Sequence, residues 1–106
     1  MGLFTFLRSP DINEGLEEFN ATENAILLDV RTPEEYRTGH IPGSRNIPFG
    51  SIQTVAGIIA DKSTPIFVHC LSGGRSGQAA AILKRMGYKN VTNIGGISGY
   101  RGKVTR

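Results

Sequence analysis

The single cysteine, Cys70, stands between an apolar run and a glycine-rich turn, in the segment HCLSGGRSGQAAAIL of residues 69–83. A thiol reacts as its thiolate, and the unpaired N–H groups at a helix N-terminus favour that anion. Gly73 and Gly74 let several backbone N–H groups converge on one point, and Arg75 adds a positive charge. A lone cysteine is most often a small buried hydrophobe, but such a cysteine needs no turn of this kind after it. The segment therefore predicts Cys70 to be an activated nucleophile.

Four short segments have the residue types of strands buried in a parallel sheet. They cover residues 25–30, 45–48, 65–68 and 91–94. Helical patterns precede or separate them at residues 11–19, 32–39, 52–59 and 79–86. Within the second of these helices, Thr32 and Glu35 form a capping box around Pro33, and Gly39 ends the helix. The alternation predicts an α/β fold, an open and mainly parallel sheet with helices on both faces.

Polar residues follow two of these strands where the chain leaves the sheet. In such sheets ligands bind beyond the carboxyl ends of the strands, so Cys70 shares one edge with Asp29 and Arg31. The residues after the Gly95-Gly96 turn are a third candidate group for this edge. Asp29 and Arg31 either orient the loop or the substrate, or form an ion pair that fixes the turn after their strand. His69 either tunes Cys70 or is a histidine satisfied at a strand end.

Three segments together resemble a single-domain rhodanese. They are LLDVRTPEEYRTGHIPGSRNIP (27–48), HCLSGGRS (69–76) and NIGGISGY (93–100), and the likeness extends over nearly the whole chain, as one domain of residues 1–106. The resemblance implies a five-stranded parallel sheet and a cysteine that carries sulfane sulfur as a persulfide. Tyr100 departs from the tryptophan that is common after the Gly-Gly-Ile turn, from which we expect altered packing or access and no loss of chemistry.

The resemblance also implies a reaction and a set of site residues. Cys70 takes a sulfur atom from thiosulfate or a related persulfide donor, and the loop N–H groups and Arg75 stabilise the persulfide. Because the chain has one cysteine, the acceptor is external: cyanide in an assay, a thiol or an acceptor protein in the cell. The residues predicted to bind the donor are Leu71, Ser72, Gly73, Gly74, Asp29 and Arg31.

Two other classes of protein stay open on the same residues. The fold relatives of rhodaneses include phosphatases, whose loops have five residues between cysteine and arginine. Here four residues separate Cys70 from Arg75, and Ser76 stands where a phosphatase has arginine. The shorter loop suits a persulfide sulfur and opposes a phosphatase or an arsenate reductase. A binding module without catalysis normally lacks the nucleophile or the glycine-rich loop, and this chain has both.

Composition limits the partners. Residues 1–40 contain eight acidic and three basic residues, whereas residues 41–106 contain one acidic and nine basic ones, within a net charge of +3. A modest basic field attracts small anions, but dispersed bases without interleaved aromatic residues argue against nucleic acid. The two histidines, His40 and His69, lack partners at metal-ligand spacing, so no metal or other cofactor is predicted.

Cysteine usage and the N-terminal residues predict the compartment. One cysteine makes no internal disulfide, which is typical of a reducing compartment. The apolar stretch of residues 3–7 is too short for a membrane span or a signal peptide. Phe6 stands where a myristoylation signal needs serine or threonine. We therefore expect a cytoplasmic protein.

Overall fold

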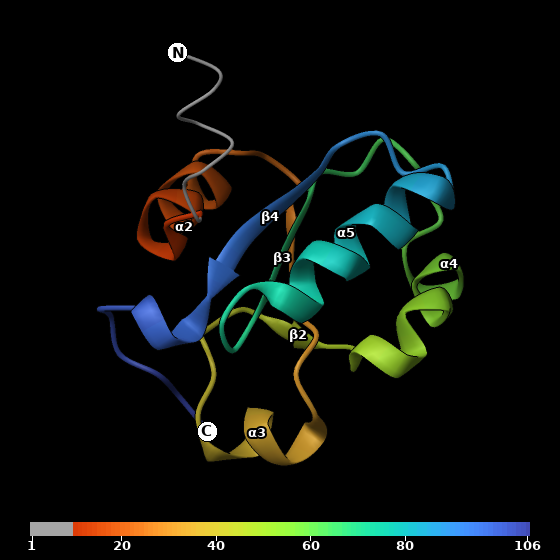
Figure 1. Cartoon of the computed structure of the whole chain (residues 1–106). Coiled ribbons are helices and arrows are strands. Elements are labelled where there is room, and N and C mark those ends of the chain that lie inside the picture. Colours follow the sequence, from red (N-terminus) through yellow and green to blue (C-terminus); the bar gives the residue numbers. More distant parts are fainter. Residues whose placement is uncertain (1–9) are drawn as a thin grey trace.

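The computed structural model describes residues 10–106, so the expectations for residues 3–7 and Phe6 lie outside the described part of the chain. Its centre is a sheet of parallel strands in the order β2-β1-β3-β4 (Figure 1). The strands are β1 (Ile26–Asp29), β2 (Arg45–Asn46), β3 (Ile66–Cys70) and β4 (Val91–Gly96). All four lie within or next to the apolar segments that predicted them, and the predicted α/β class is confirmed.

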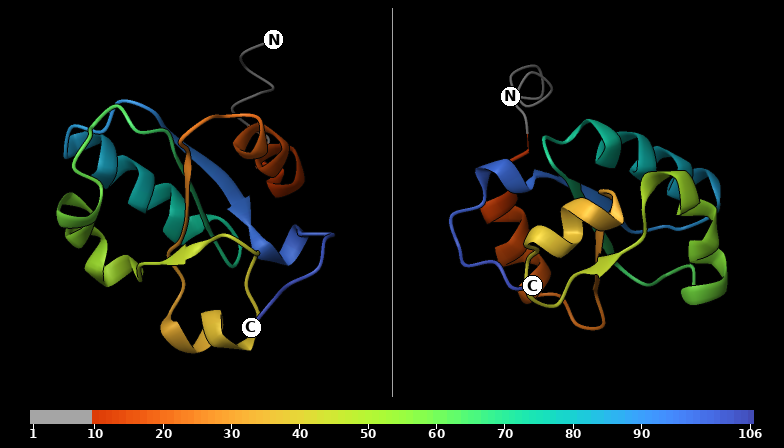
Figure 2. Two further views of the ribbon diagram at one scale, coloured as in Figure 1. Left: turned by 180° about the vertical axis from the view of Figure 1, so that it is seen from behind. Right: turned by 90° about the horizontal axis from the view of Figure 1, so that it is seen from below.

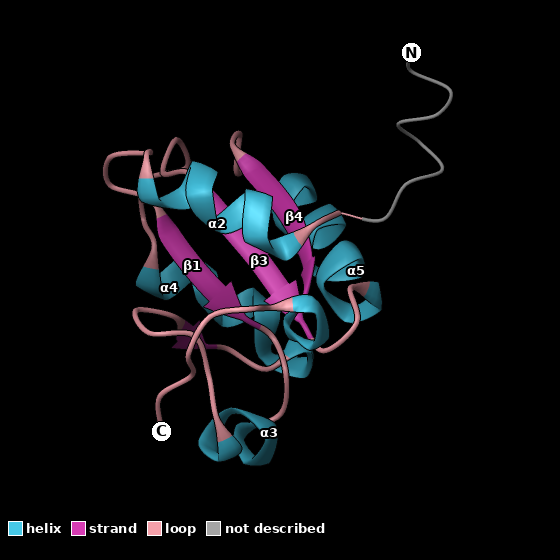
Figure 3. Cartoon of the chain, turned by 90° about the vertical axis from the view of Figure 1, so that its left-hand side faces the viewer, coloured by secondary structure: helices cyan, strands magenta, loops and turns pink. Residues whose placement is uncertain are grey.

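Helices cover both faces of the sheet, as predicted. The α-helices are α2 (Ile12–Asn20), α3 (Pro33–Thr38), α4 (Val55–Ile58) and α5 (Gly74–Arg85). Two 3-10 helices are η1 (Phe49–Thr54) and η2 (Ile97–Gly99). Helix α2 lies on one face, and α4 and α5 lie on the other (Figures 2 and 3). Among the described residues, no helix is long and apolar enough to cross a membrane.

The sheet has four strands over residues 10–106, where the resemblance implied five. The reason lies in the chain itself, since these residues contain only four apolar segments suited to a buried strand. Outside the named strands, the one further pairing in this part of the chain is an isolated antiparallel bridge between His40 and Thr105. The predicted number of strands was therefore wrong for the described residues, although the arrangement of layers was right.

The predicted helix over residues 52–59 is also different in the structure. A 3-10 helix, η1, begins directly after Pro48 and is interrupted by non-helical backbone angles at Ser51. Only Val55–Ile58 is α-helical, and neither η1 nor α4 has a side-chain cap. Gly50 and Gly57 weaken both ends of this segment because glycine loses the most backbone entropy on entering a helix. Packing of Ile52 and Val55 against the sheet fixes the segment instead.

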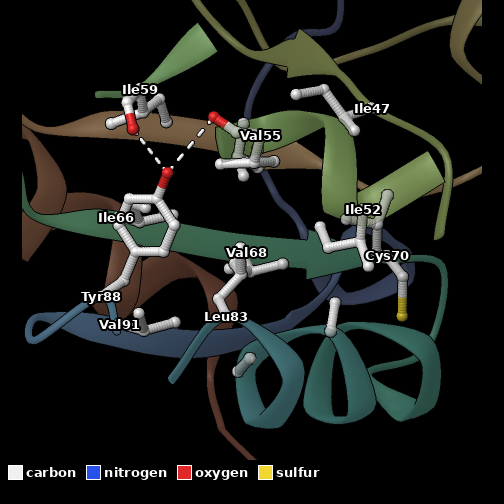
Figure 4. Packing of buried hydrophobic residues seen from close by; sticks show 14 residues of the cluster. Ile47, Ile52, Val55, Ile59, Ile66, Val68, Cys70, Leu83, Tyr88 and Val91 are labelled. Carbon is white, nitrogen blue, oxygen red and sulfur yellow. Dashed lines mark hydrogen bonds between the residues drawn. The ribbon is translucent and has the colours of Figure 1, made fainter. Parts of the chain in front are cut away.

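The sheet separates two apolar cores. The larger core lies between the sheet and the α4/α5 layer, and Cys70 belongs to it (Figure 4). The Tyr88 hydroxyl in this core lies within hydrogen-bond reach of the backbone carbonyls of Val55 and Ile59, which joins α4 to the segment after α5. The smaller core lies under α2 and contains Ile12, Leu27, Ile41, Phe67 and Ile94. Complete burial of a leucine or isoleucine contributes about 1.5–3 kcal/mol, so these cores hold the strands that end at the site.

The strand order places a topological switch point between the carboxyl ends of β1 and β3. The chain leaves β1 towards β2 in one direction and leaves β3 towards β4 in the other, and in open parallel sheets the loops diverge at such a point. Helix α3 lies beyond this edge of the sheet (Figure 3). Its predicted capping box is present: Glu35 N donates to Thr32 Oγ1, and Thr32 N donates to Glu35 Oε1.

Candidate active site

Cys70 is the last residue of β3 and is almost completely buried, with 1% of its surface exposed. Its partner in the neighbouring strand is Gly96. The side chain points towards the start of α5 (Figure 4), and Sγ accepts a hydrogen bond from Gly73 N at 3.0 Å. The sulfur therefore lies between the end of β3 and the loop that starts α5.

The turn after Cys70 has the form that its glycines predict. Gly73 adopts a φ of 106°, in the left-handed region, and is the N-cap of α5. The twelve-residue helix α5 begins at Gly74, so its unpaired N–H groups and the positive end of its dipole adjoin Cys70. The loop from Cys70 to Arg75 is consequently a strand-to-helix turn that holds N–H groups around one sulfur.

Strand β4 supports this loop from below, which the sequence interpretation did not identify. A Cβ atom at Gly96 would lie 2.3 Å from Leu71 O, so only glycine allows the loop to lie this close. Ser98 N donates to Leu71 O at 3.0 Å. Asn93 Oδ1 accepts from the Ser76 hydroxyl at 2.7 Å and from Gly95 N at 3.0 Å. The Gly95-Gly96 turn was the available signal: the residues after it were a candidate group for this edge, and Ser98 does contact the loop, but the support from Gly96 and Asn93 was not predicted.

Burial and hydrogen bonding act in opposite directions on the Cys70 thiol. Burial raises its pKa, but hydrogen bonds from Ser76 and from the backbone N–H groups of Gly73 and Ser72 outweigh burial, and the pKa lies below its ordinary value. The Ser76 hydroxyl has a single proton and donates it to Asn93 at 2.7 Å. We therefore assign most of the thiolate stabilisation to backbone N–H groups, of which Gly73 N is the one at 3.0 Å.

Arg75 lies beside the loop and pairs with a residue that the sequence interpretation treated only as a cap. Its Nη1 donates to Glu35 Oε1 at 2.9 Å, and its Nη2 donates to Glu35 Oε2 at 3.1 Å. The hydrogen bonds to Arg75, and then that to Thr32, lower the pKa of Glu35 to about 2. One indirect sign of this contact was present in the sequence. Glu35 lies in the first turn of a helix at the carboxyl edge of the sheet, where the Cys70 loop also lies.

Asp29 and Arg31 form a separate, buried pair. Arg31 donates from Nε and Nη2 to the Asp29 carboxylate at 2.8–3.0 Å, and Nη2 also donates to Gly39 O. Of the two alternatives for Asp29 and Arg31, this geometry matches the ion pair that fixes the turn after their strand. Burial acts to raise the pKa of Asp29. The nearby His69 ring and the hydrogen bonds from Arg31 outweigh burial, and the pKa is lowered to about 2. A role of Asp29 and Arg31 in donor binding stays a prediction.

His69 completes this cluster from β3. It is fully buried, and its Nε2 lies 3.3 Å from Asp29 Oδ2. The contact is not aligned as a hydrogen bond, and neither ring nitrogen has a hydrogen-bond partner among residues 10–106. The geometry therefore favours a polar contact between β1 and β3 over the fully hydrogen-bonded histidine of the sequence interpretation.

The remaining loop residues differ in exposure. Leu71, with 45% of its surface exposed, and Ser72 face solvent, and Gly74 is also exposed. Donor contacts by Leu71, Ser72, Gly73 and Gly74 stay predictions. Tyr100 packs with the core under α2, and its hydroxyl donates to Lys103 O at 3.0 Å.

These groups define what the site can do chemically. A thiol with a lowered pKa ends β3, backbone N–H groups converge on it, and a guanidinium stands at the side of the loop. Such a site suits nucleophilic attack by sulfur and stabilisation of a negatively charged atom attached to Cys70.

Comparison with known proteins is consistent with this chemistry. The Rhodanese-like domain family model matches residues 12–103. Thiosulfate sulfurtransferase PspE of Escherichia coli (strain K12) is 42% identical over 71 residues, which cover 66% of this chain and 68% of PspE. The solved structure of a rhodanese with anions from E. coli matches with a TM-score of 0.72 and 36% identity, covering 77% of this chain and 98% of that one.

A further solved structure of similar fold is described as having a different possible activity. It is a protein of unknown function from Rhodopseudomonas palustris CGA009, described as a possible tyrosine phosphatase. It matches with a TM-score of 0.73 and 28% identity, covering 86% of this chain and 77% of that one. The family model nevertheless spans all of the strands and helices described above. The chain therefore belongs to the rhodanese-like domain family.

Proposed function

We propose that this protein is a sulfurtransferase that carries sulfane sulfur as a persulfide on Cys70. The observation that carries the proposal is the position of Sγ, which accepts a hydrogen bond from Gly73 N at 3.0 Å within the loop that starts α5. The lowered pKa of the thiol supports attack as a thiolate. The names of relatives, among them thiosulfate sulfurtransferase PspE, support the same activity.

The reaction has two balanced steps. The Cys70 thiolate attacks the outer sulfur of thiosulfate, a new S–S bond forms, and sulfite leaves with the electron pair of the broken S–S bond. The persulfide anion is held by the loop N–H groups and by the helix dipole. Cyanide or a thiolate then attacks the outer sulfur, and the Cys70 thiolate is released.

The donor and the acceptor differ in what the site requires of them. The donor is a small anion, because the sulfur is buried and Arg75 lies beside the loop. The acceptor comes from outside the chain, because Cys70 is its only cysteine. In the cell this acceptor is a thiol or a protein that bears one.

The R. palustris neighbour favours dephosphorylation as a second candidate. Ser76, the position where a phosphatase has arginine, is fully buried and hydrogen-bonded to Asn93. A phosphoryl group in this loop would therefore lack the guanidinium that the wider phosphatase loop supplies. This arrangement supports sulfur transfer over dephosphorylation.

The test is to load the protein with thiosulfate, measure its intact mass, and then assay thiocyanate after adding cyanide. We expect one added sulfur atom, lost on cyanide addition, and no adduct or thiocyanate from Cys70→Ser with an unchanged circular dichroism spectrum. Because the chain has one cysteine, a persulfide adduct is assigned without further mapping.

An aryl phosphate in the same assay separates the two candidate functions. Hydrolysis of that substrate by the wild type at a higher rate than thiocyanate formation would replace sulfur transfer with dephosphorylation. Thiocyanate production by folded Cys70→Ser at the wild-type rate would show that Cys70 is not the nucleophile.

A further inference from the structure

The Arg75 guanidinium is already bound by a carboxylate of the same chain. Both terminal nitrogens donate to Glu35, at 2.9 and 3.1 Å, so the two partners meet in a bidentate geometry. The side chains are 36% and 30% exposed, which leaves the pair in contact with solvent at the side of the loop. An incoming anion therefore meets an ion pair there, and not an unpaired cation.

Glu35 is held in this position independently of Arg75. Its Oε1 accepts a hydrogen bond from Thr32 N at 2.8 Å, and its own backbone N–H donates to Thr32 Oγ1. The capping box that starts α3 thus fixes the carboxylate at the edge of the sheet. Glu35 stays beside Arg75 when the guanidinium turns away.

The pair has a direct effect on an anionic donor. The carboxylate cancels most of the positive charge of Arg75 at short range and repels an anion that approaches the same nitrogens. Because both side chains are partly exposed, water screens the pair and separating it is not costly. A donor with enough negative charge displaces Glu35, and a weakly charged donor gains little by doing so.

We propose that Glu35 determines specificity by competing with the donor anion for Arg75, which weakens the binding of a dianion such as thiosulfate more than that of a monoanionic sulfur donor. This inference rests on the proposed sulfur transfer and adds to it the charge class of the donor. Glu35 is a positioning residue here, since it acts through Arg75 and does not touch the reacting sulfur.

The test is Glu35→Gln, because glutamine keeps the capping box and removes the charge. The matched control is Glu34→Gln, which removes the same charge from a carboxylate that is 76% exposed and 3.8 Å from Arg37. Steady-state kinetics are measured with thiosulfate and with methanethiosulfonate, a monoanion that donates the same kind of sulfur from a sulfonyl group.

With Glu35→Gln we expect the KM for thiosulfate to fall about three- to fivefold, the size of one exposed bidentate pair, with kcat unchanged. The KM for methanethiosulfonate should change less, about twofold at most, because the donor carries half the charge. Glu34→Gln should leave both constants at their wild-type values. Arg75→Ala should remove most of the gain from Glu35→Gln, since the competition passes through the guanidinium and only the direct repulsion by the carboxylate is left.

Two results would overturn the inference. Equal KM values for wild type, Glu35→Gln and Glu34→Gln would show that Glu35 does not compete with the donor. A raised KM for thiosulfate in folded Glu35→Gln would show that Glu35 orients Arg75 towards the donor instead.

A binding experiment separates this inference from the proposed reaction. Thiosulfate is titrated into Cys70→Ser proteins with and without Glu35→Gln, by calorimetry, so that no turnover is needed. Tighter binding in the double variant supports the competition even when the wild type forms no persulfide. Equal binding contradicts the competition even when the wild type forms thiocyanate.

Discussion

Two hydrogen-bonded arginine–carboxylate pairs lie near the carboxyl edge of the sheet, and they differ mainly in burial. Asp29 and Arg31 are 0% and 5% exposed, and their contacts include the Gly39 carbonyl and the His69 ring. Glu35 and Arg75 are 30% and 36% exposed, and Arg75 is the last residue of the loop that follows Cys70. Each arginine makes at least two hydrogen bonds to its carboxylate.

The difference shows that hydrogen-bond geometry alone does not separate a structural pair from a functional one. A buried pair cannot exchange its partner for a ligand without leaving a charge unpaired away from water, and this costs several kcal/mol. Separating a pair that is about one-third exposed costs about 1 kcal/mol or less. We therefore expect the first pair to hold the turn after β1 and the second to be available to an anion.

The largest predicted effect is on stability. The same chemical change, from a carboxylate to its amide, is made in each pair. Asp29→Asn should lower the free energy of unfolding by about 3–5 kcal/mol, because it leaves the buried Arg31 guanidinium without a counter-charge. Glu35→Gln should lower it by less than about 1 kcal/mol, since its pair is exposed and the cap is kept. Urea unfolding at pH 7 measures both values.

Equal losses in the two variants would contradict the comparison. A loss below about 1 kcal/mol for Asp29→Asn would show that the buried cluster tolerates a neutral partner, and Asp29 and Arg31 would return as candidates for donor binding.

The next effect is on activity. Arg75→Ala should lower kcat/KM for thiosulfate about tenfold, within the range of one hydrogen bond to a charged group. Its stability should stay within about 1 kcal/mol of the wild type, because Arg75 is one-third exposed. Thiocyanate assays and urea unfolding of the same preparation measure both. Wild-type turnover in the folded variant would show that the guanidinium only pairs with Glu35.

Much of the fold was predictable because its signals are local. The apolar run at residues 65–68 indicated β3, and Thr32 with Glu35 indicated the start of α3. The segment 52–59 was less predictable, because its apolar spacing suits a helix while uncapped ends and nearby glycines leave only Val55–Ile58 in an α-helix. The fifth strand came from the family resemblance, and no segment of residues 10–106 forms it.

The candidate site was predictable where its residues are adjacent in sequence, and not where distant residues meet. Cys70 and its glycine-rich turn are adjacent in sequence, so residue types alone placed the thiol at a helix N-terminus. The Arg75 and Glu35 contact joins residues 40 positions apart, and the close approach of Gly96 to Leu71 also depends on strand pairing. Local patterns do not show which distant residue an arginine or a glycine will contact. Both contacts are therefore visible only in the structure.

The smallest predicted effect concerns acid, where both carboxylates have a pKa of about 2 in the folded protein. These values are below the ordinary 3.8 of aspartate and 4.5 of glutamate, so the unfolded chain binds more protons as the pH falls through this range. The stability from both pairs is present above about pH 5 and is lost as the pH approaches 2.

Because solvent screens Glu35, its share is under about 1 kcal/mol. Urea unfolding at pH 7 and pH 3 should therefore give Glu35→Gln a slightly smaller acid loss than the wild type, and Asp29→Asn a clearly smaller one. An equal reduction in both variants would mean that the exposed pair is coupled to folding as strongly as the buried one, and the separation of the two pairs into a structural and a functional one would fail.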